Sequence, residues 1–306
     1  MKTIQLGQSD LMVPIVGIGC MRMNSLTEEQ AKCYLQSALE KGINFFDHAD
    51  IYGGGACEEF FAHAIEMNST IREKIILQSK CGIIPTRTFD LSKEHILSAV
   101  DGSLKRLKTD YLDIFLLHRP DALVQPEEVA EAFDKLHSSG KVRYFGVSNH
   151  NPMQIQLLNK WIKQPIIVNQ LQLSVTNNTM ISSGINVNME NEAAINRDSS
   201  VLDFCRLNDI TIQAWSPFQY GFFEGCFLND EKFPSLNARI DLIASKYGVS
   251  NTTIALAWIL RHPARMQPII GTMNISRLED CIKAADIYLS REEWYDIYKA
   301  AGNILP

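Results

Sequence analysis

Eight short apolar segments recur along this chain, and helical patterns separate them. They span residues 16–19, 43–47, 75–80, 111–118, 144–148, 166–170, 210–215 and 268–271. Short apolar strands that alternate with helices are typical of parallel βαβ units. Eight such units in 306 residues favour a closed (β/α)8 TIM barrel of the α/β class, and a doubly wound open sheet is the alternative. No linker interrupts the alternation, so we expect a single domain over residues 1–306.

Local signals predict the elements at the start of the chain. Residues 3–16 predict a β-hairpin whose turn lies at residues 7–10. Thr27 followed by Gln30 predicts a capping box at the start of the first helix, and Gly42 predicts the end of that helix.

Two long segments, residues 174–198 and 218–234, are predicted to be loops. The first is rich in asparagine, and the second carries six aromatic residues. Both follow predicted strands, so we expect both to lie on the C-terminal rim of the barrel. Loops of this length inside a compact domain are usually functional or mobile.

Charge and composition narrow the classes of function. The net charge is −6 and no basic block is present, which argues against nucleic-acid binding. No apolar run approaches the roughly 20 residues that span a bilayer, and the first residues lack the apolar core of a signal peptide. The seven cysteines are odd in number and lack C-x-x-C spacing, which disfavours a disulfide framework and a zinc site. We therefore expect a cytoplasmic protein. Separately, we expect a monomer or weak homo-oligomer whose partner is a small molecule.

Ionisable side chains follow the apolar runs at three successive strands. Asp47 ends the second strand and Tyr52 lies just behind it, Lys80 ends the third strand, and His118 ends the fourth. Catalytic groups of a barrel come from the C-terminal ends of several strands. Asp47 is the natural anion for a lysine flanked by apolar core, and we expect the lysine to lower the pKa of Tyr52. Tyr52 is then a candidate proton donor, with His118 beside it as a hydrogen-bond donor.

A phenol that protonates an oxygen suits the reduction of a carbonyl group, for which a cofactor must bring the hydride. Ser148, Asn149 and Gln170 end the fifth and sixth strands, and their hydroxyl and amide groups could hold a carboxamide. Trp215 ends the seventh strand and offers a flat apolar face to a planar ring. The rim therefore predicts a nicotinamide site.

Each of these side chains also has a plain structural interpretation. Lys80 could be a strand-end lysine whose amine reaches solvent, His118 a hydrogen-bonded core histidine, and Trp215 part of the core. The acids around His48 could instead bind a metal ion. Four such groups on three successive strand ends favour the active-site interpretation.

The segments that carry this prediction resemble the signature segments of the aldo-keto reductase family. In chain order they are residues 42–53, 78–80, 116–118, 145–149, 169–170 and 215–217. The resemblance covers nearly the whole chain, and segment 174–198 makes it similar to a bacterial, short-tailed branch. It implies a barrel enzyme that reduces aldehydes or ketones to alcohols with NADPH, with Tyr52 as the proton donor.

The resemblance also implies individual site residues. The catalytic tetrad of the family falls on Asp47, Tyr52, Lys80 and His118. The family's cofactor-binding positions fall on Gly19, Cys20, Met21, Asp47, Ser148, Asn149, Gln170, Trp215, Ser216, Pro217, Phe218, Gly271, Thr272, Met273, Arg277, Asp280 and Cys281. Within this set Ser148, Asn149 and Gln170 correspond to carboxamide contacts and Trp215 to the position that stacks on the ring. No metal ion is implied.

The chain departs from the family pattern where the adenosine phosphate is expected to bind. Many members carry Lys-Ser where this chain has Gly271-Thr272, and many carry asparagine where it has Cys281. We therefore expect NADPH to be preferred while NADH is used more weakly. Only residues 302–306 follow the last predicted helix, so we expect an open substrate face.

Two other classes of function fit a barrel of this kind, because a fold alone does not fix the activity. One is a cofactor-bound redox-sensing or regulatory subunit with little turnover, as in the channel-associated relatives of the family. The other is a barrel enzyme of different chemistry, such as a metal-dependent hydrolase.

Overall fold

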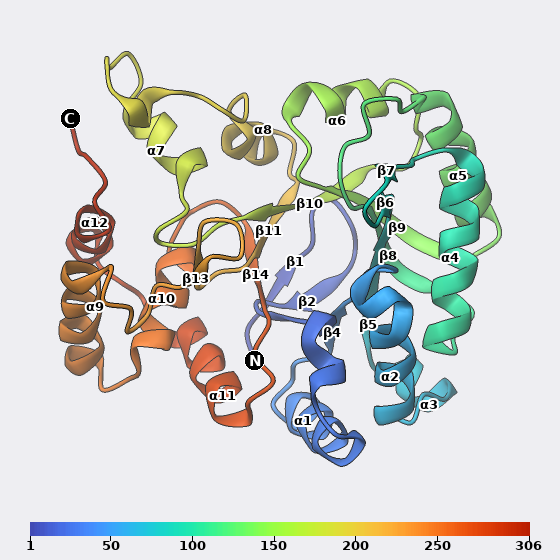
Figure 1. The fold of residues 1–306 in the computed structure, drawn as a ribbon, viewed down its shortest axis with the longest axis horizontal. Coiled ribbons are helices and arrows are strands. Elements are labelled where there is room, and N and C mark those ends of the chain that lie inside the picture. Colours follow the sequence, from blue (N-terminus) through green and yellow to red (C-terminus); the bar gives the residue numbers. More distant parts are fainter.

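The computed structural model describes residues 1–306, and eight parallel strands at its centre close into a barrel (Figure 1). The strands follow the order β10-β11-β14-β3-β4-β5-β8-β9 around the barrel. Their bounds are β3 (Gly17–Gly19), β4 (Phe45–Asp47), β5 (Ile76–Cys81), β8 (Leu112–Leu117), β9 (Val142–Ser148), β10 (Ile166–Gln172), β11 (Thr211–Trp215) and β14 (Met266–Ile270). The eight predicted strands are these eight, so the TIM barrel is confirmed and the open sheet is wrong.

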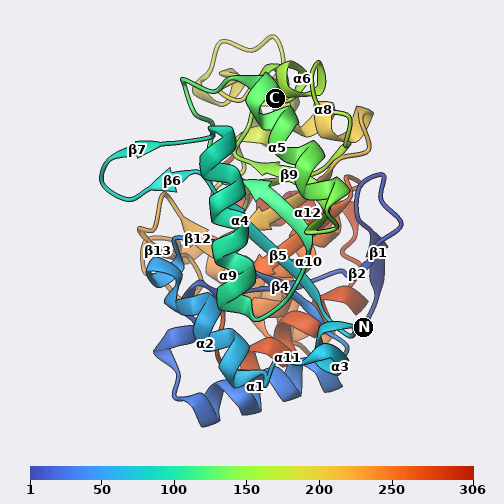
Figure 2. The same cartoon turned by 90° about the vertical axis from the view of Figure 1, so that its right-hand side faces the viewer.

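Helices surround the barrel on its outer face (Figures 1 and 2). The helices of the chain are α1 (Glu28–Glu40), α2 (Ala56–Ala64), α3 (Ser69–Arg72), α4 (Lys93–Leu107), α5 (Pro126–Ser138), α6 (Pro152–Asn159), α7 (Thr179–Ile185), α8 (Val201–Leu207), α9 (Pro234–Tyr247), α10 (Asn251–Leu260), α11 (Ile275–Lys283) and α12 (Arg291–Ala300), of which α7 lies in a rim segment. The predicted capping box at α1 is confirmed, since Thr27 Oγ1 accepts the Gln30 N–H and Gln30 Oε1 accepts the Thr27 N–H. None of the helices is long and apolar enough to cross a membrane.

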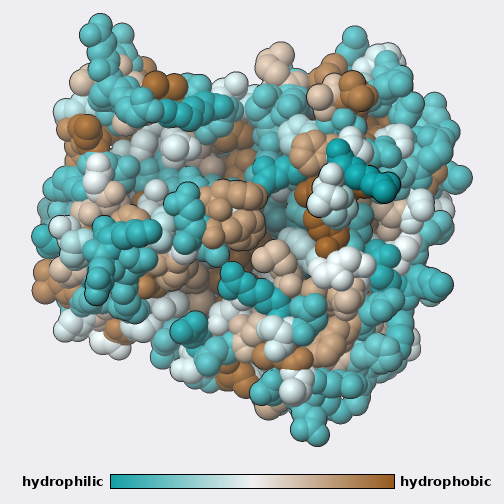
Figure 3. Space-filling view, in the orientation of Figure 1, coloured by the Kyte–Doolittle hydropathy of each residue, from teal (hydrophilic) through white to brown (hydrophobic).

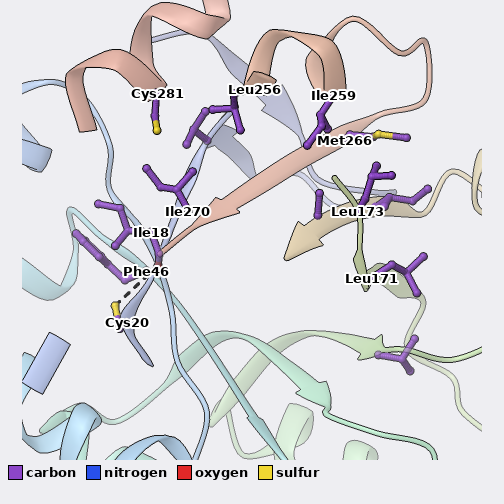
Figure 4. Close-up of a cluster of buried hydrophobic side chains, with 14 of the residues drawn as sticks. Ile18, Cys20, Phe46, Leu171, Leu173, Leu256, Ile259, Met266, Ile270 and Cys281 are labelled. Atoms are coloured by element: carbon purple, nitrogen blue, oxygen red, sulfur yellow. Dashed lines mark hydrogen bonds between the residues drawn. The ribbon is translucent and has the colours of Figure 1, made fainter. Parts of the chain in front are cut away.

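The apolar core has two layers. The larger lies between the barrel strands and the helices, and Figure 4 shows part of it, where Ile18 and Ile270 of the barrel face Leu256 of α10. The smaller fills the barrel interior and includes Phe45 and Leu116. Both layers hold the strands rigidly, so side chains at the strand ends are fixed in place.

The N-terminal hairpin of β1 (Thr3–Gln5) and β2 (Met12–Pro14) is confirmed, and it closes the N-terminal end of the barrel. Its turn packs so closely that a Cβ on Gly7 would lie 2.3 Å from the carbonyl oxygen of Ile167. The Gly7 N–H donates to Thr211 Oγ1 at 2.8 Å, and Gln267 Nε2 donates to the Pro14 carbonyl oxygen at 2.7 Å. The rim residues therefore lie at the opposite, C-terminal end of the barrel, which the hairpin does not cover.

The long rim segments follow β10 and β11 as predicted, but they are more ordered than loops. Segment 174–198 contains α7, and segment 218–234 contains a hairpin of β12 (Gln219–Tyr220) and β13 (Gly225–Cys226). A further hairpin of β6 (Ile83–Ile84) and β7 (Thr88–Phe89) follows β5 and projects from the barrel in Figure 2. Figure 3 shows apolar patches separated by polar side chains on the face that Figure 1 presents.

Candidate active site

The structure brings Asp47, Tyr52, Lys80 and His118 together at the C-terminal rim. β4 and β5 pair in parallel with Asp47 opposite Gln78, which places Asp47 beside Lys80 two residues further along β5. Lys80 is fully buried, and its ammonium group donates to an Asp47 carboxylate oxygen at 2.8 Å. It also donates to the His48 carbonyl oxygen at 2.7 Å and to Tyr52 Oη at 3.2 Å. All three donors of the ammonium group are therefore used.

Tyr52 is positioned by a tight turn whose backbone conformation favours glycine. It opens the 3₁₀ turn Tyr52–Gly55, in which Gly53 and Gly54 have φ angles of 59° and 65°. These values lie in the left-handed region that glycine adopts without strain. The turn directs the phenol back over Lys80, whose Nζ lies 4.9 Å from the ring centroid.

The pKa of Tyr52 is set by opposing effects. Burial raises the pKa of this phenol, and Asp47 adds to that effect, while Lys80 lowers it. Lys80 lowers the pKa of the phenol as expected, but burial outweighs this effect, so the net pKa is above the ordinary value. The reason is that burial removes water from the phenolate, and Lys80 already shares its charge with Asp47. Tyr52 therefore keeps its proton at neutral pH, which is the state that a proton donor requires.

Lys80 keeps its charge despite its position. Burial lowers the pKa of this amine, but Asp47 and Tyr52 together raise it above its usual value. The ion pair with Asp47 is thus what allows a fully buried ammonium group at this point of the barrel.

His118 lies beside Tyr52 as a neutral ring. Burial lowers its pKa well below the usual value, and the cations of Lys80 and Arg119 lower it further. The two rings meet edge to face, with centroids 6.0 Å apart. A neutral imidazole in this place can donate one N–H to a ligand oxygen beside the phenol.

Four buried glutamines run through the barrel interior below the site. Gln78 Nε2 donates to Asp47 Oδ1 at 2.6 Å and to Gln213 Oε1 at 2.8 Å. Gln170 Nε2 donates to the same two oxygens, each at 3.1 Å. Gln213 Nε2 then donates to Gln267 Oε1 at 2.9 Å. This network fixes the Asp47 carboxylate from below and continues to the N-terminal hairpin.

Of the four glutamines, sequence reasoning identified Gln170 alone. Gln78, Gln213 and Gln267 each stand inside an apolar strand segment. That interruption is the signal that could have found them, because a polar group inside a barrel needs a hydrogen-bond partner.

A second hydrogen-bonded chain joins the four predicted nicotinamide contacts. Ser148 Oγ donates to the Gln170 carbonyl oxygen at 2.9 Å, and Asn149 Nδ2 donates to Ser148 Oγ at 2.8 Å. Trp215 Nε1 donates to Asn149 Oδ1 at 3.2 Å. The half-buried indole is therefore held in one orientation at the end of β11, with Ser216, Pro217 and Phe218 directly after it.

The predicted adenosine-phosphate segment forms the turn between β14 and α11. Thr272 Oγ1 accepts the Asn274 N–H at 3.2 Å, and Asn274 caps α11 by accepting the Arg277 N–H at 3.0 Å. Arg277 is exposed and pairs with no carboxylate. The segment from Gly271 through Met273 is likewise accessible, so a ligand could reach it.

Other predicted positions point elsewhere. The thiols of Cys20 and Cys281 are buried in the apolar core (Figure 4), which leaves backbone atoms as their means of contact with a ligand. Asp280 forms an ion pair with Lys283 at 3.2 Å. Gly19 is buried at the end of β3, and Met21 is exposed.

The acids near His48 do not converge on a common point. No group of three or more His, Cys, Asp or Glu side chains is arranged to hold a metal ion. His48 is fully buried with its ring against Phe61, and neither ring nitrogen has a partner in the protein. The rim is thus built around one ion pair and a phenol.

Comparisons of the sequence and of the structure with known proteins identify one family. A sequence model of the Aldo/keto reductase family matches residues 15–301. The chain is 35% identical over 314 residues to the uncharacterized oxidoreductase YcsN of Bacillus subtilis, covering 98% of each chain. It is 33% identical over 311 residues to a 6-dehydroglucose reductase of Novosphingobium aromaticivorans, covering 99% of this chain and 96% of that one.

Among solved structures, the chain resembles the thermostable aldo-keto reductase Tm1743 in complex with the inhibitor epalrestat. The TM-score is 0.78 at 28% sequence identity, with 98% of this chain and 100% of the other covered. The two proteins thus share the barrel along its whole length. The chain belongs to the aldo-keto reductase family and is an NAD(P)H-dependent oxidoreductase.

Proposed function

We propose that the protein reduces small aldehydes or ketones to alcohols with NADPH, and that Tyr52 donates the proton. The observation that carries the proposal is the contact of one buried ammonium group, Lys80, with both the Asp47 carboxylate and the Tyr52 phenol. A protonated phenol supported by a fixed cation at an open rim suits a reaction in which negative charge develops on an oxygen.

The rim residues fit a nicotinamide. The Trp215 ring is half-buried and held by Asn149, which suits stacking on a flat ring. The Gln170 amide nitrogen is engaged by Asp47 and Gln213, while its oxygen accepts no hydrogen bond from the protein and can accept one from a carboxamide. When bound, a reduced nicotinamide supplies the hydride that the protein itself lacks.

The protein's own part in the reaction is the handling of the carbonyl oxygen. Tyr52 and His118 donate hydrogen bonds to that oxygen, which fixes its position and polarises the carbonyl group. As negative charge grows on the oxygen, the Tyr52 proton passes to it. The phenolate that remains is stabilised by Lys80, whose charge Asp47 maintains. The neutral state of His118 suits a hydrogen-bond donor rather than a competing acid.

Replacement of Tyr52 tests the proposal. Tyr52→Phe keeps the ring and removes the proton donor, so we expect NADPH binding to persist and turnover of an aldehyde to fall by roughly two or more orders of magnitude. The measurements are the absorbance of the reduced nicotinamide during turnover and the dissociation constant of NADPH. Near-normal turnover by the variant would reject Tyr52 as the donor. A wild-type protein that binds NADPH but reduces no carbonyl would favour the regulatory alternative.

We base the proposed preference for NADPH on Arg277 of α11, which is positioned to bind the additional phosphate of that cofactor. Arg277 lies in the first turn of this helix, exposed and without an acidic partner. Backbone N–H groups at a helix start favour a phosphate, and a guanidinium binds it through two parallel hydrogen bonds. Gly271 contributes no second cation, so we propose that NADH remains a weaker cofactor. We also propose a cytoplasmic setting, which the seven free thiols support.

A further inference from the structure

Arg119 directly follows His118 at the end of β8, and it faces the rim. Its guanidinium carbon lies 5.9 Å from the centroid of the Trp215 ring and 5.8 Å from that of Phe222. Phe222 and Phe223 belong to the tip of the β12–β13 hairpin, and both rings pack against Trp215, with centroids 6.3 Å and 6.1 Å away. Arg119 is therefore half-buried between aromatic rings next to the proposed reaction centre.

No acid in the protein compensates the charge of Arg119. Its guanidinium forms no ion pair and donates no hydrogen bond to another residue. The acid closest in sequence, Asp121, is engaged elsewhere: its carboxylate accepts the N–H groups of Leu91 at 3.1 Å and Leu123 at 2.8 Å. Across the rim, Asp47 is committed to Lys80.

Two other arginines that the fold buries pair with acids, and half-buried Arg261, which has no acidic partner, donates to the Leu289 carbonyl oxygen at 2.7 Å. Arg72 pairs with Asp113 at 2.7 Å and donates to two carbonyl oxygens, and Arg106 pairs with Glu58 at 2.7 Å. A half-buried guanidinium has lost part of its hydration, and an ion pair with an anion normally compensates for the hydration free energy that is lost. Arg119 lacks that anion although it has five N–H donors, and it lies beside His118 and Trp215 at the proposed site.

We propose that Arg119 binds a carboxylate on the substrate, so that the preferred substrates are aldehydes or ketones that also carry a carboxylate group. The planar guanidinium can hold a carboxylate through two parallel hydrogen bonds. Phe222 and Phe223 form the walls that cover the carbon skeleton between the carboxylate and the carbonyl group. This inference rests on the proposed reductase function and names the substrate class of the same site.

Two pairs of probes test the proposal at two chain lengths. One pair is 4-carboxybenzaldehyde and its neutral methyl ester, and the other is 4-oxobutanoate and its methyl ester. We expect the wild-type kcat/KM to favour the acid in at least one pair by more than tenfold. Arg119→Gln should lower that preference by roughly tenfold to a hundredfold, the usual effect of a charge-assisted hydrogen bond. The loss should fall mainly on KM for the acid, with the ester changed less than about threefold.

Variants and a binding measurement complete the design. Arg119→Lys keeps the charge without the planar fork and should retain part of the preference. Arg206→Gln removes a surface arginine from α8, paired with Asp203, and should leave the preference unchanged. Calorimetry with 4-(hydroxymethyl)benzoate, the acid product, should show weaker binding to Arg119→Gln than to the wild type.

Three outcomes would overturn the role of Arg119. The wild type could reduce acids and esters equally well, or Arg119→Gln could weaken both to the same extent, which would make the guanidinium a structural wall. The third is a loss of NADPH affinity in Arg119→Gln with the acid preference intact, which would assign the guanidinium to the cofactor. A wild type that reduces none of the four probes with NADPH would instead contradict the proposed function itself.

Discussion

Lys80 and Tyr52 titrate as a coupled pair, because the same ammonium group contacts the phenol and the carboxylate of Asp47. Burial and Asp47 raise the pKa of Tyr52, and Lys80 opposes them. Removing the ammonium group therefore removes the lowering effect and leaves the raising effects in place. The phenol should then hold its proton to higher pH.

We expect Lys80→Met to move the basic limb of the pH–rate profile to higher pH and to lower the rate, because the phenolate formed in the reaction loses its cation. The measurement is kcat/KM for an aldehyde across the pH range, with the NADPH dissociation constant as the control for folding. The value obtained describes the cluster rather than one residue. An unchanged basic limb would show that another group sets the pKa of Tyr52.

The residues that the sequence brought forward are those whose position along the strand is informative. Asp47, Lys80 and His118 each end an apolar run, and parallel strands of a barrel place such ends on one rim. Arg119 was overlooked because its significance depends on which acids lie near it, and its sequence neighbour Asp121 turns away to bind backbone groups. The net pKa of Tyr52 depended in the same way on burial, which a strand pattern does not measure.

At the scale of the elements, the glutamines of the barrel interior link four strands. Gln213 of β11 is central, because its oxygen accepts from Gln78 and Gln170 and its nitrogen donates to Gln267. We expect Gln213→Leu to lower the free energy of unfolding by about 1–3 kcal/mol for each buried polar group that is left without a hydrogen-bond partner, such as Gln267 Oε1. Chemical denaturation of the two proteins measures the difference.

A surface glutamine provides the control for Gln213. Gln8 also donates one hydrogen bond, to the Asn208 carbonyl oxygen at 2.9 Å, but in an exposed position. Gln8→Leu should change the free energy of unfolding by less than about 0.5 kcal/mol, since water replaces the lost bond. Equal effects of the two substitutions would mean that the interior network contributes no more than a surface contact.

The N-terminus of α11 is the element that should discriminate between the two cofactors. Arg277 is the cation in the first turn of α11 and has no acidic partner. Lys283, at the other end of the same helix, pairs with Asp280. We expect the wild type to bind NADPH roughly tenfold to a hundredfold more tightly than NADH, as one charge-assisted contact implies. Arg277→Ala should remove that difference by weakening NADPH alone. The dissociation constants of both cofactors measure it.

The matched control for Arg277 is Lys283→Ala, which removes a cation from the other end of the same helix. It should leave both dissociation constants unchanged, because its ammonium group is paired and remote from the helix N-terminus. Equal affinities of the wild type for NADPH and NADH would reject the phosphate contact.

At the scale of the whole molecule, the barrel could be predicted because each strand is a mostly apolar segment that alternates with a helical pattern, and the observed bounds differ from the predicted ones by at most two residues. The rim hairpins could not, because strands of two residues carry no periodicity. α7 was missed for a different reason. It lies in an asparagine-rich segment and depends on distant contacts, such as the hydrogen bond between Ser182 Oγ and Tyr298 Oη of α12 at 3.0 Å.

Acid stability is a property of the whole molecule that follows from its buried ionisable groups. Burial lowers the pKa of His48 to about 3 and that of His150 to about 4. Both values are below those of the unfolded chain, so the unfolded state binds more protons in this range, and stability is lost as pH falls below about 6.5. Asp50 acts in the opposite sense, because burial and the neighbouring Glu58 raise its pKa to about 7. Its buried charge destabilises the fold above the unfolded pKa, and protonation relieves this as pH falls.

Because these groups oppose each other, single variants separate them better than the wild-type curve does. His48 packs on Phe61, and its ring nitrogens have no partners, so His48→Phe removes the titrating group at little structural cost. Between pH 7.5 and pH 5 this variant should lose about 2 kcal/mol less stability than the wild type. Asp50→Asn should lose more than the wild type, since the relief by protonation is gone. Denaturant unfolding of the wild type and both variants at pH 7.5 and pH 5 gives the free energy of unfolding of each variant relative to the wild type at each pH. If this relative stability changed in the same direction between the two pH values for both variants, the assignment would be contradicted.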